Sequence, residues 1–335
     1  MKYGLCVPVF ANPGAAFFRT PALTTLDPCA SIDAAVEAER LGFDSVWVAD
    51  HLMHGFDDAI MEGWTTLSVI AGRTSRVGLG TIHLAQPFRA PAIAAKMAAT
   101  LDAVSAGRLI FFYDCGWQAA EVQAFGLEWP EEHERIQRMD EGLSLIEALW
   151  TSQQPLDFDG RYFSTHAAVC RPAPRQQPRP PIWLGEARSE MWLDAIVRHA
   201  DGWNSTPASP ERLRGKLDAL RAACVRSGRN LDQLELSLEI QVLVAPTEAE
   251  VRAIARRIAG LEPSKRGSPR TDILARLESE DGSPLRVDDW LVGTPYAVRE
   301  QLEAYSALGI SHFMLWFLDY PSMDGMRLFM EEVAR

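Results

Sequence analysis

Short apolar runs alternate with longer segments of mixed polarity along the whole chain. Near-continuous apolar residues in a short run are typical of a strand buried on both faces of a parallel sheet. In the longer segments, apolar positions recur every three or four residues, as they do along one face of a helix. Strands are predicted at residues 3–10, 43–49, 77–84, 108–113, 182–185, 202–205, 234–244 and 312–318.

Helical spacing fills the segments between the predicted strands, and Gly42 and Gly107 end two of these helices. Helices are predicted at residues 31–41, 64–73, 92–105, 119–125, 134–150, 190–199, 210–227, 248–259, 294–309 and 323–333. Eight strand-plus-helix units complete one round of a closed barrel. We therefore predict an α/β fold, a (β/α)8 TIM barrel that forms a single domain over residues 1–335. Two insertions interrupt the repeat, a small hairpin within about residues 151–181 and a polar stretch at about residues 260–288.

Polar and small residues follow three successive predicted strands. Asp50 and His51 follow the second strand, His83 lies at the end of the third, and residues 114–117 follow the fourth. In a parallel barrel, the carboxyl ends of all strands open onto one face, where active sites are normally built. The pattern therefore predicts an enzyme whose site lies at this face.

Charge and composition narrow the possible partners. The formal net charge of −12 at pH 7 disfavours binding to nucleic acid or to an anionic membrane surface, since both require a basic face. No run of about 18 apolar residues indicates a membrane span, and the first residues do not resemble a secretion signal. The five cysteines are scattered without a Cys-x-x-Cys spacing, so reduced thiols and a cytoplasmic protein are expected.

Several short motifs occur in the order that is typical of one known family. They are GFDSVWVADH at residues 42–51, TSRVGLGT at 74–81, AKMAATLD at 95–102, SAGRL at 105–109, PPIWLG at 180–185 and ADGW at 200–203. With these motifs the chain resembles, from end to end, the bacterial luciferase-like superfamily of flavin- and deazaflavin-dependent oxidoreductases. The resemblance implies a barrel that binds its cofactor at the carboxyl ends of the strands.

The resemblance implies two catalytic functions. The first is a luciferase-like monooxygenase that uses reduced FMN and O2 on a small organic substrate, with a flavin reductase as the partner that supplies reduced FMN. The alternative is a dehydrogenase or reductase that depends on the deazaflavin coenzyme F420. A non-catalytic flavin-binding protein is a further alternative, and a homo-oligomer is expected in each case. In all of them the cofactor carries the chemistry and the protein orients it.

His51 is the predicted catalytic residue. In deazaflavin relatives the histidine of this Asp-His pair lies beside the cofactor ring, and an imidazole titrates near neutral pH. Asp50 is expected to fix its tautomer; alternatively, Asp50 caps the next turn and His51 packs under the ring. The resemblance also places Thr81, Ile82 and His83 at the cofactor, with a cis peptide bond between Ile82 and His83. The alternative is an ordinary trans strand end with His83 facing solvent.

Residues 112–116 depart from the family pattern. Phe112, Tyr113 and Asp114 stand where many deazaflavin relatives have a glycine-rich run. Bulkier side chains there would reshape the floor of the cofactor site. Cys115 and Gly116 are predicted cofactor contacts, although a buried core thiol is an equal interpretation of Cys115.

Gly185, Arg188 and Ser189 are predicted to bind a phosphate of the cofactor. They lie between a strand and a helix, where backbone N–H groups and an arginine attract anions. The second glycine that is common after Gly185 is absent. The alternative is a plain serine cap with Arg188 in solvent. In the loop after the first strand, Phe17 and Phe18 line the substrate pocket or pack on the barrel rim.

Neither a metal site nor a cofactor contact by a tryptophan is predicted. Asp50, His51, His54 and His83 could cluster, but their spacing matches no standard metal motif, so no metal is predicted. Large aromatic side chains mostly serve the core. Core or rim packing is predicted for Trp64, Trp150 and Trp203.

Overall fold

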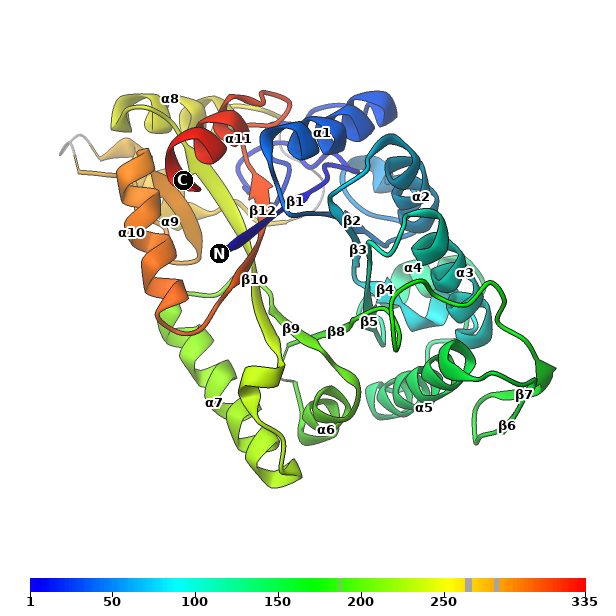
Figure 1. The fold of residues 1–335 in the computed structure, drawn as a ribbon. Coiled ribbons are helices and arrows are strands. Elements are labelled where there is room, and N and C mark those ends of the chain that lie inside the picture. Colours follow the sequence, from blue (N-terminus) through cyan, green and yellow to red (C-terminus); the bar gives the residue numbers. More distant parts are fainter. Residues whose placement is uncertain (187, 263–266, 280–282) are drawn as a thin grey trace.

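Eight parallel strands close into a barrel in the computed structural model, which describes residues 1–186, 188–262, 267–279 and 283–335 (Figure 1). The strands in barrel order are β1 (Lys2–Cys6), β2 (Ser45–Ala49), β3 (Gly78–Ile82), β5 (Leu109–Asp114), β8 (Ile182–Gly185), β9 (Gly202–Ser205), β10 (Glu235–Val244) and β12 (His312–Phe317). The ring closes because β12 pairs with both β10 and β1. The predicted strands and the TIM-barrel class are confirmed. β1 ends earlier than predicted, just before Pro8, which has no N–H for a strand ladder.

Helices surround the strands (Figure 1). They are α1 (Pro28–Leu41), α2 (Gly63–Arg73), α3 (Pro91–Val104), α4 (Ala119–Ala124), α5 (Glu132–Thr151), α6 (Glu190–His199), α7 (Pro210–Ser227), α8 (Glu248–Ala259), α9 (Thr271–Glu278), α10 (Pro295–Ser306) and α11 (Asp324–Leu328), with a π-helical turn at Phe329–Val333. Local signals set their ends: Asp27 caps α1, and Gly42 ends it at a left-handed φ of 98°. Within the described ranges, no helix is long and apolar enough to cross a membrane.

The structure agrees with the prediction for the first insertion and differs from it for the second. The first contains the antiparallel hairpin of β6 (Leu156–Asp159) and β7 (Ser164–Ala168), as predicted. The second was predicted as a polar stretch only, yet it contains α9, whose Ile273 and Leu277 are buried. Their burial against Trp290 makes a second core, which the short amphipathic pattern alone did not reveal. Residues 263–266 and 280–282 of this insertion lie outside the described part.

Several short segments were not predicted. β11 (Trp290–Gly293) pairs with the end of β10, and β4 (Leu84–Ala85) pairs with the end of β5. The turn η2 (Gln86–Phe88) then leads into α3. Such short segments carry too few residues to show a period.

Aromatic side chains fill the interior of the barrel beneath the carboxyl ends of its strands. Trp47 and Trp183 lie with ring centroids 5.1 Å apart, and Phe112 packs at 6.2 Å from each. Gly80 makes room for this layer, since a Cβ there would lie 2.2 Å from the Trp47 ring. Side chains therefore fill the interior of the barrel. A binding site at the barrel axis can open only at the carboxyl ends of the strands.

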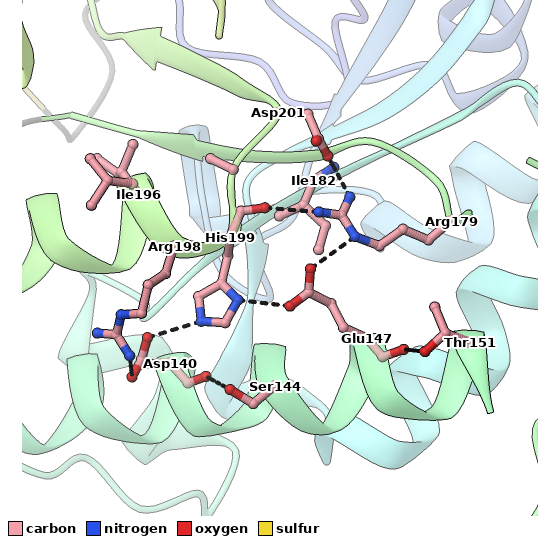
Figure 2. A network of polar contacts seen from close by, with 12 residues as sticks. Asp140, Ser144, Glu147, Thr151, Arg179, Ile182, Ile196, Arg198, His199 and Asp201 are labelled. Atoms are coloured by element: carbon pink, nitrogen blue, oxygen red, sulfur yellow. Dashed lines mark hydrogen bonds and ion pairs between the residues drawn. The ribbon is translucent and has the colours of Figure 1, made fainter. Parts of the chain in front are cut away.

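A polar network fixes α6 against α5 (Figure 2). His199, near the end of α6, bonds Glu147 through Nδ1 at 2.8 Å and Asp140 through Nε2 at 3.1 Å. Arg179 extends the network, because it pairs with Glu147 at 2.8 Å and with Asp201. Burial opposes the charged imidazole, but Asp140 and Glu147 outweigh it and raise the pKa of His199. The network holds the helix that follows the loop at Gly185.

Candidate active site

The strand ends bring several of the predicted residues into one pocket. Asp50 and His51 follow β2, His83 follows β3, and Asp114 ends β5. All four line a small pocket at the carboxyl face, together with Gly116. The site lies where the sequence pattern indicated.

His51 is held by a residue that the sequence analysis missed. Its Nδ1 lies 2.7 Å from Oε1 of Glu121 on α4, and both side chains are buried. Oε2 of Glu121 accepts the backbone N–H groups of Leu52 at 2.8 Å and Met53 at 3.1 Å. This carboxylate therefore fixes both the imidazole and the loop that carries it, and leaves Nε2 as the ring nitrogen not engaged by Glu121.

The prediction that Asp50 fixes the tautomer of His51 is wrong. Asp50 instead binds both terminal nitrogens of Arg89, at 2.8 and 2.9 Å, and accepts the N–H of Ala85 at 3.0 Å. Arg89 also pairs with Glu62, whose side chain caps α2. A buried carboxylate needs a fixed countercharge, and Arg89 supplies it for Asp50. The ion pair joins the loop after β2 to the segment after β3.

His83 lies at the centre of the barrel mouth. The predicted cis peptide bond between Ile82 and His83 is confirmed, and the imidazole is largely buried rather than in solvent. Its ring centroid lies 4.2 Å from that of Phe112. Burial lowers the pKa of His83, and its buried Nε2 has no hydrogen-bond partner within the described ranges. A neutral ring with one unpaired nitrogen is suited to a hydrogen bond with a ligand.

Thr81 and Ile82 are buried next to His83. The hydroxyl of Thr81 donates to the carbonyl of Phe112 at 3.4 Å, across to β5. Ile82 is 3% exposed and belongs to the core. Neither lines the pocket around His51.

Arg188 reaches from the loop before α6 to the end of β5. It lies 3.3 Å from Oδ2 of Asp114 and 3.8 Å from Sγ of Cys115. Asp114 also accepts the N–H of Gly116 at 2.7 Å. Burial raises the pKa of Cys115 to about 12, so it is a buried neutral thiol. The side chain of Arg188 is 26% exposed, and its ion pair with Asp114 holds it at the barrel mouth.

Glu186 occupies the position of the missing second glycine. It adopts a φ of 65°, which non-glycine residues rarely take. Its carboxylate accepts the N–H of Thr206 at 2.7 Å and pairs with Lys216 at 2.9 Å, which compensates for this strain. Ser189 caps α6 by accepting the N–H of Trp192 at 3.3 Å. Ala187, also within the predicted phosphate loop, lies outside the described residues.

The two phenylalanines of the first loop have different surroundings. Phe17 is buried in the second core against Trp290, at 5.7 Å between ring centroids. Phe18 lines a wider cleft of about 790 Å³ beside the small pocket, and Trp117 borders both spaces. The three tryptophans predicted to pack are buried: Trp64, Trp150 and Trp203. In the part of the chain that the structure describes, no three His, Cys, Asp or Glu side chains group as they would around a metal ion.

The luciferase-like monooxygenase family model matches residues 16–312. This chain belongs to that family. A similar protein is the F420-dependent glucose-6-phosphate dehydrogenase of Nakamurella multipartita, 30% identical over 315 residues, which cover 91% of each chain. The FMNH2-dependent dimethylsulfone monooxygenase of Pseudomonas putida is 26% identical over 303 residues, 84% of this chain and 81% of the relative.

Solved structures in the luciferase-like family share the fold. An F420-dependent secondary alcohol dehydrogenase in complex with an F420-acetone adduct aligns with a TM-score of 0.74 at 21% identity, over 99% of this chain and 98% of that one. The monooxygenase RslO1 from Streptomyces bottropensis also gives a TM-score of 0.74, at 23% identity, over 100% and 99%. The expected family is confirmed, and its named relatives include both deazaflavin- and FMN-dependent enzymes.

Proposed function

We propose that this luciferase-like protein is an F420-dependent oxidoreductase that interconverts a small organic alcohol and its carbonyl form. The observation that carries the proposal is the buried His51–Glu121 pair at the barrel mouth, 2.7 Å between Nδ1 and Oε1. A relative that is 30% identical over 91% of both chains is named for the same cofactor, which supports this choice. F420, when bound, exchanges a hydride with the substrate.

The residues at the mouth fit such a cofactor. The buried Nε2 of His83 has no hydrogen-bond partner in the described part of the chain and would bond a polar edge of the ring. Arg188 and the capped start of α6 at Ser189 would attract the anionic part of the cofactor. Gly116 and Gly185 present backbone without side chains beside these groups. Cys115, Thr81 and Ile82 are buried and would support the cofactor site from the barrel interior.

His51 would move the proton that alcohol oxidation releases. A hydride leaves the carbon as a proton leaves the hydroxyl, so a base is needed close to the substrate. Glu121 stabilises the imidazolium that forms when Nε2 accepts this proton. Burial lowers the pKa of His83, which disfavours its protonated form and suits it to accepting a hydrogen bond from a ligand. Asp50 would act indirectly, by holding the loop.

A reduced-FMN monooxygenase is the second candidate. Phe112, Tyr113 and Asp114 stand where many deazaflavin relatives have a glycine-rich run, which favours this alternative. The Pseudomonas putida relative is named for reduced FMN. This function would require O2 and a flavin reductase as a partner. In either case the substrate is a small organic molecule, and a homo-oligomer remains a prediction.

Activity and binding together test the proposal. Wild-type protein should bind F420 and reduce it anaerobically with an alcohol, whereas reduced FMN with O2 should support no oxygenation. His51→Ala should lose turnover and keep F420 binding, because the imidazole moves a proton rather than holding the cofactor. His166→Ala, on the exposed hairpin, is the matched control and should behave as wild type. Unchanged turnover in His51→Ala would exclude the proton-transfer role.

A further inference from the structure

A second cleft opens on the outside of the barrel, between α8 and α11. Its volume is about 430 Å³, and the end of β10 forms part of its base. The two helices lie next to each other above the ends of β10 and β12 (Figure 1). None of its lining residues lines the pocket around His51. The cleft is thus separate from the proposed active site.

Asp319 lies at the base of this cleft. The residue is only 3% exposed, and Oδ2 accepts the N–H of Gly325 at 3.0 Å. Oδ1 is buried and has no hydrogen-bond partner among the residues that the structure describes. The carboxylate is pressed against the start of α11, since a Cβ on Gly325 would lie 2.8 Å from both oxygens. The carboxylate therefore cannot rotate toward α11 to reach a second donor. Among the described residues, Oδ1 accepts no hydrogen bond.

The walls of the cleft combine acidic and aliphatic groups. Glu250 on α8 and Asp324 at the start of α11 add two carboxylates to that of Asp319. The guanidinium of Arg257 lies in the lining, and that of Arg327 lies 3.6 Å from Asp324. Ile254 contributes aliphatic surface, with Ala253 and Leu328 beside it. An anion would be repelled by three carboxylates, whereas a cation with N–H donors would be attracted. A buried acceptor without a donor is costly unless a ligand supplies one.

We propose that this cleft binds a small organic cation, a primary ammonium group on an aliphatic body. The ammonium group donates a hydrogen bond to Oδ1 of Asp319, and the aliphatic body packs between α8 and α11. An ammonium group carries three donors and no acceptor, which matches an environment of carboxylate oxygens. Charge-assisted hydrogen bonds of this kind are about twice as strong as neutral ones. The proposal does not depend on the reaction at the barrel mouth.

Calorimetric titration of the full chain with n-hexylammonium chloride tests the site. Wild type should bind hexylammonium at least about tenfold more tightly than 1-hexanol, which has the same body but no charge. Hexanoate should not bind, because its carboxylate faces those of the cleft. Asp319→Asn should weaken hexylammonium binding by about tenfold or more. Glu128→Gln, whose side chain is exposed and lies outside the lining of the cleft, is the control and should change it by less than about twofold.

A second variant covers the case in which Asp319→Asn does not fold. Ala253→Trp fills the cleft from the exposed face of α8 and leaves the carboxylate untouched. It should abolish hexylammonium binding while circular dichroism and F420 binding stay as in wild type. Equal binding by folded Asp319→Asn, unchanged binding by Ala253→Trp, or equal affinity for 1-hexanol would each overturn the proposal.

Discussion

Replacing Glu121 by glutamine removes the charge beside His51 and keeps the shape of the side chain. In the native protein the two oxygens of Glu121 engage three groups, at 2.7, 2.8 and 3.1 Å. Glutamine offers one oxygen and one NH2 group. In the His51 tautomer that carries its proton on Nδ1, at least one of the donors from His51, Leu52 or Met53 therefore faces another donor. An unsatisfied buried donor costs about 1–3 kcal/mol, so we expect the free energy of unfolding to fall by that amount.

The catalytic effect should exceed what this destabilisation alone can cause. Without the carboxylate, the protonated form of His51 loses its main stabilising partner. Positioned acid–base catalysis contributes roughly 10²–10⁴-fold, and we expect Glu121→Gln to lose about 10- to 100-fold of this in kcat. The KM for F420 should change little, because Glu121 does not reach the groups proposed to hold the cofactor.

Urea unfolding and steady-state kinetics on the same preparations separate the two effects. Glu128→Gln is a suitable control, because its side chain is 80% exposed and should alter neither quantity. Kinetics are measured at a temperature where the variant is fully folded. If Glu121→Gln loses stability but keeps the wild-type kcat, the pair is a structural contact and the assignment of His51 as the base is refuted.

Three further predictions concern the network and the loop around α6. Asp140 and Glu147 raise the pKa of His199 above its unfolded value, so the stabilisation is full below about pH 6.5 and is lost as pH rises through the folded pKa. Urea unfolding at pH 6 and 8.5 should show a larger loss for wild type than for His199→Gln, and equal losses would contradict this sign. Glu186→Ala keeps the strained φ of 65° and should unfold about 1 kcal/mol more easily than Glu186→Gly; equal stabilities would show that no strain is stored there. Arg188→Ala should raise the Kd for F420 about tenfold or more without changing unfolding by more than about 1 kcal/mol, and an unchanged Kd would exclude Arg188 from cofactor binding.

The fold could be predicted because buried strands and amphipathic helices leave a periodic signal in the chain. The site could be located for the same reason, since His51, His83 and Asp114 each follow a strand whose end is fixed by the barrel. Glu121 could not be found in this way. It lies 70 residues from His51 on a six-residue helix, and a single glutamate in so short a segment looks like any solvated helix residue.

The partner of Asp50 was missed for a related reason. Adjacent residues on an extended chain point in different directions, so Asp50 and His51 face different neighbours. Arg89 reaches Asp50 only because the segment after β3 folds back beside the end of β2. Local sequence gives which groups are available, whereas such long-range packing decides which of them pair.

Anaerobic titration with F420 and with reduced FMN, followed by addition of candidate alcohols, tests the central claim most directly. We expect saturable F420 binding at micromolar concentration and loss of the oxidised F420 absorbance when a substrate alcohol is added. It also predicts that His51→Ala binds F420 as tightly and fails to reduce it. Saturable binding of reduced FMN with no binding of F420 would contradict the account and assign the chain to the monooxygenase branch.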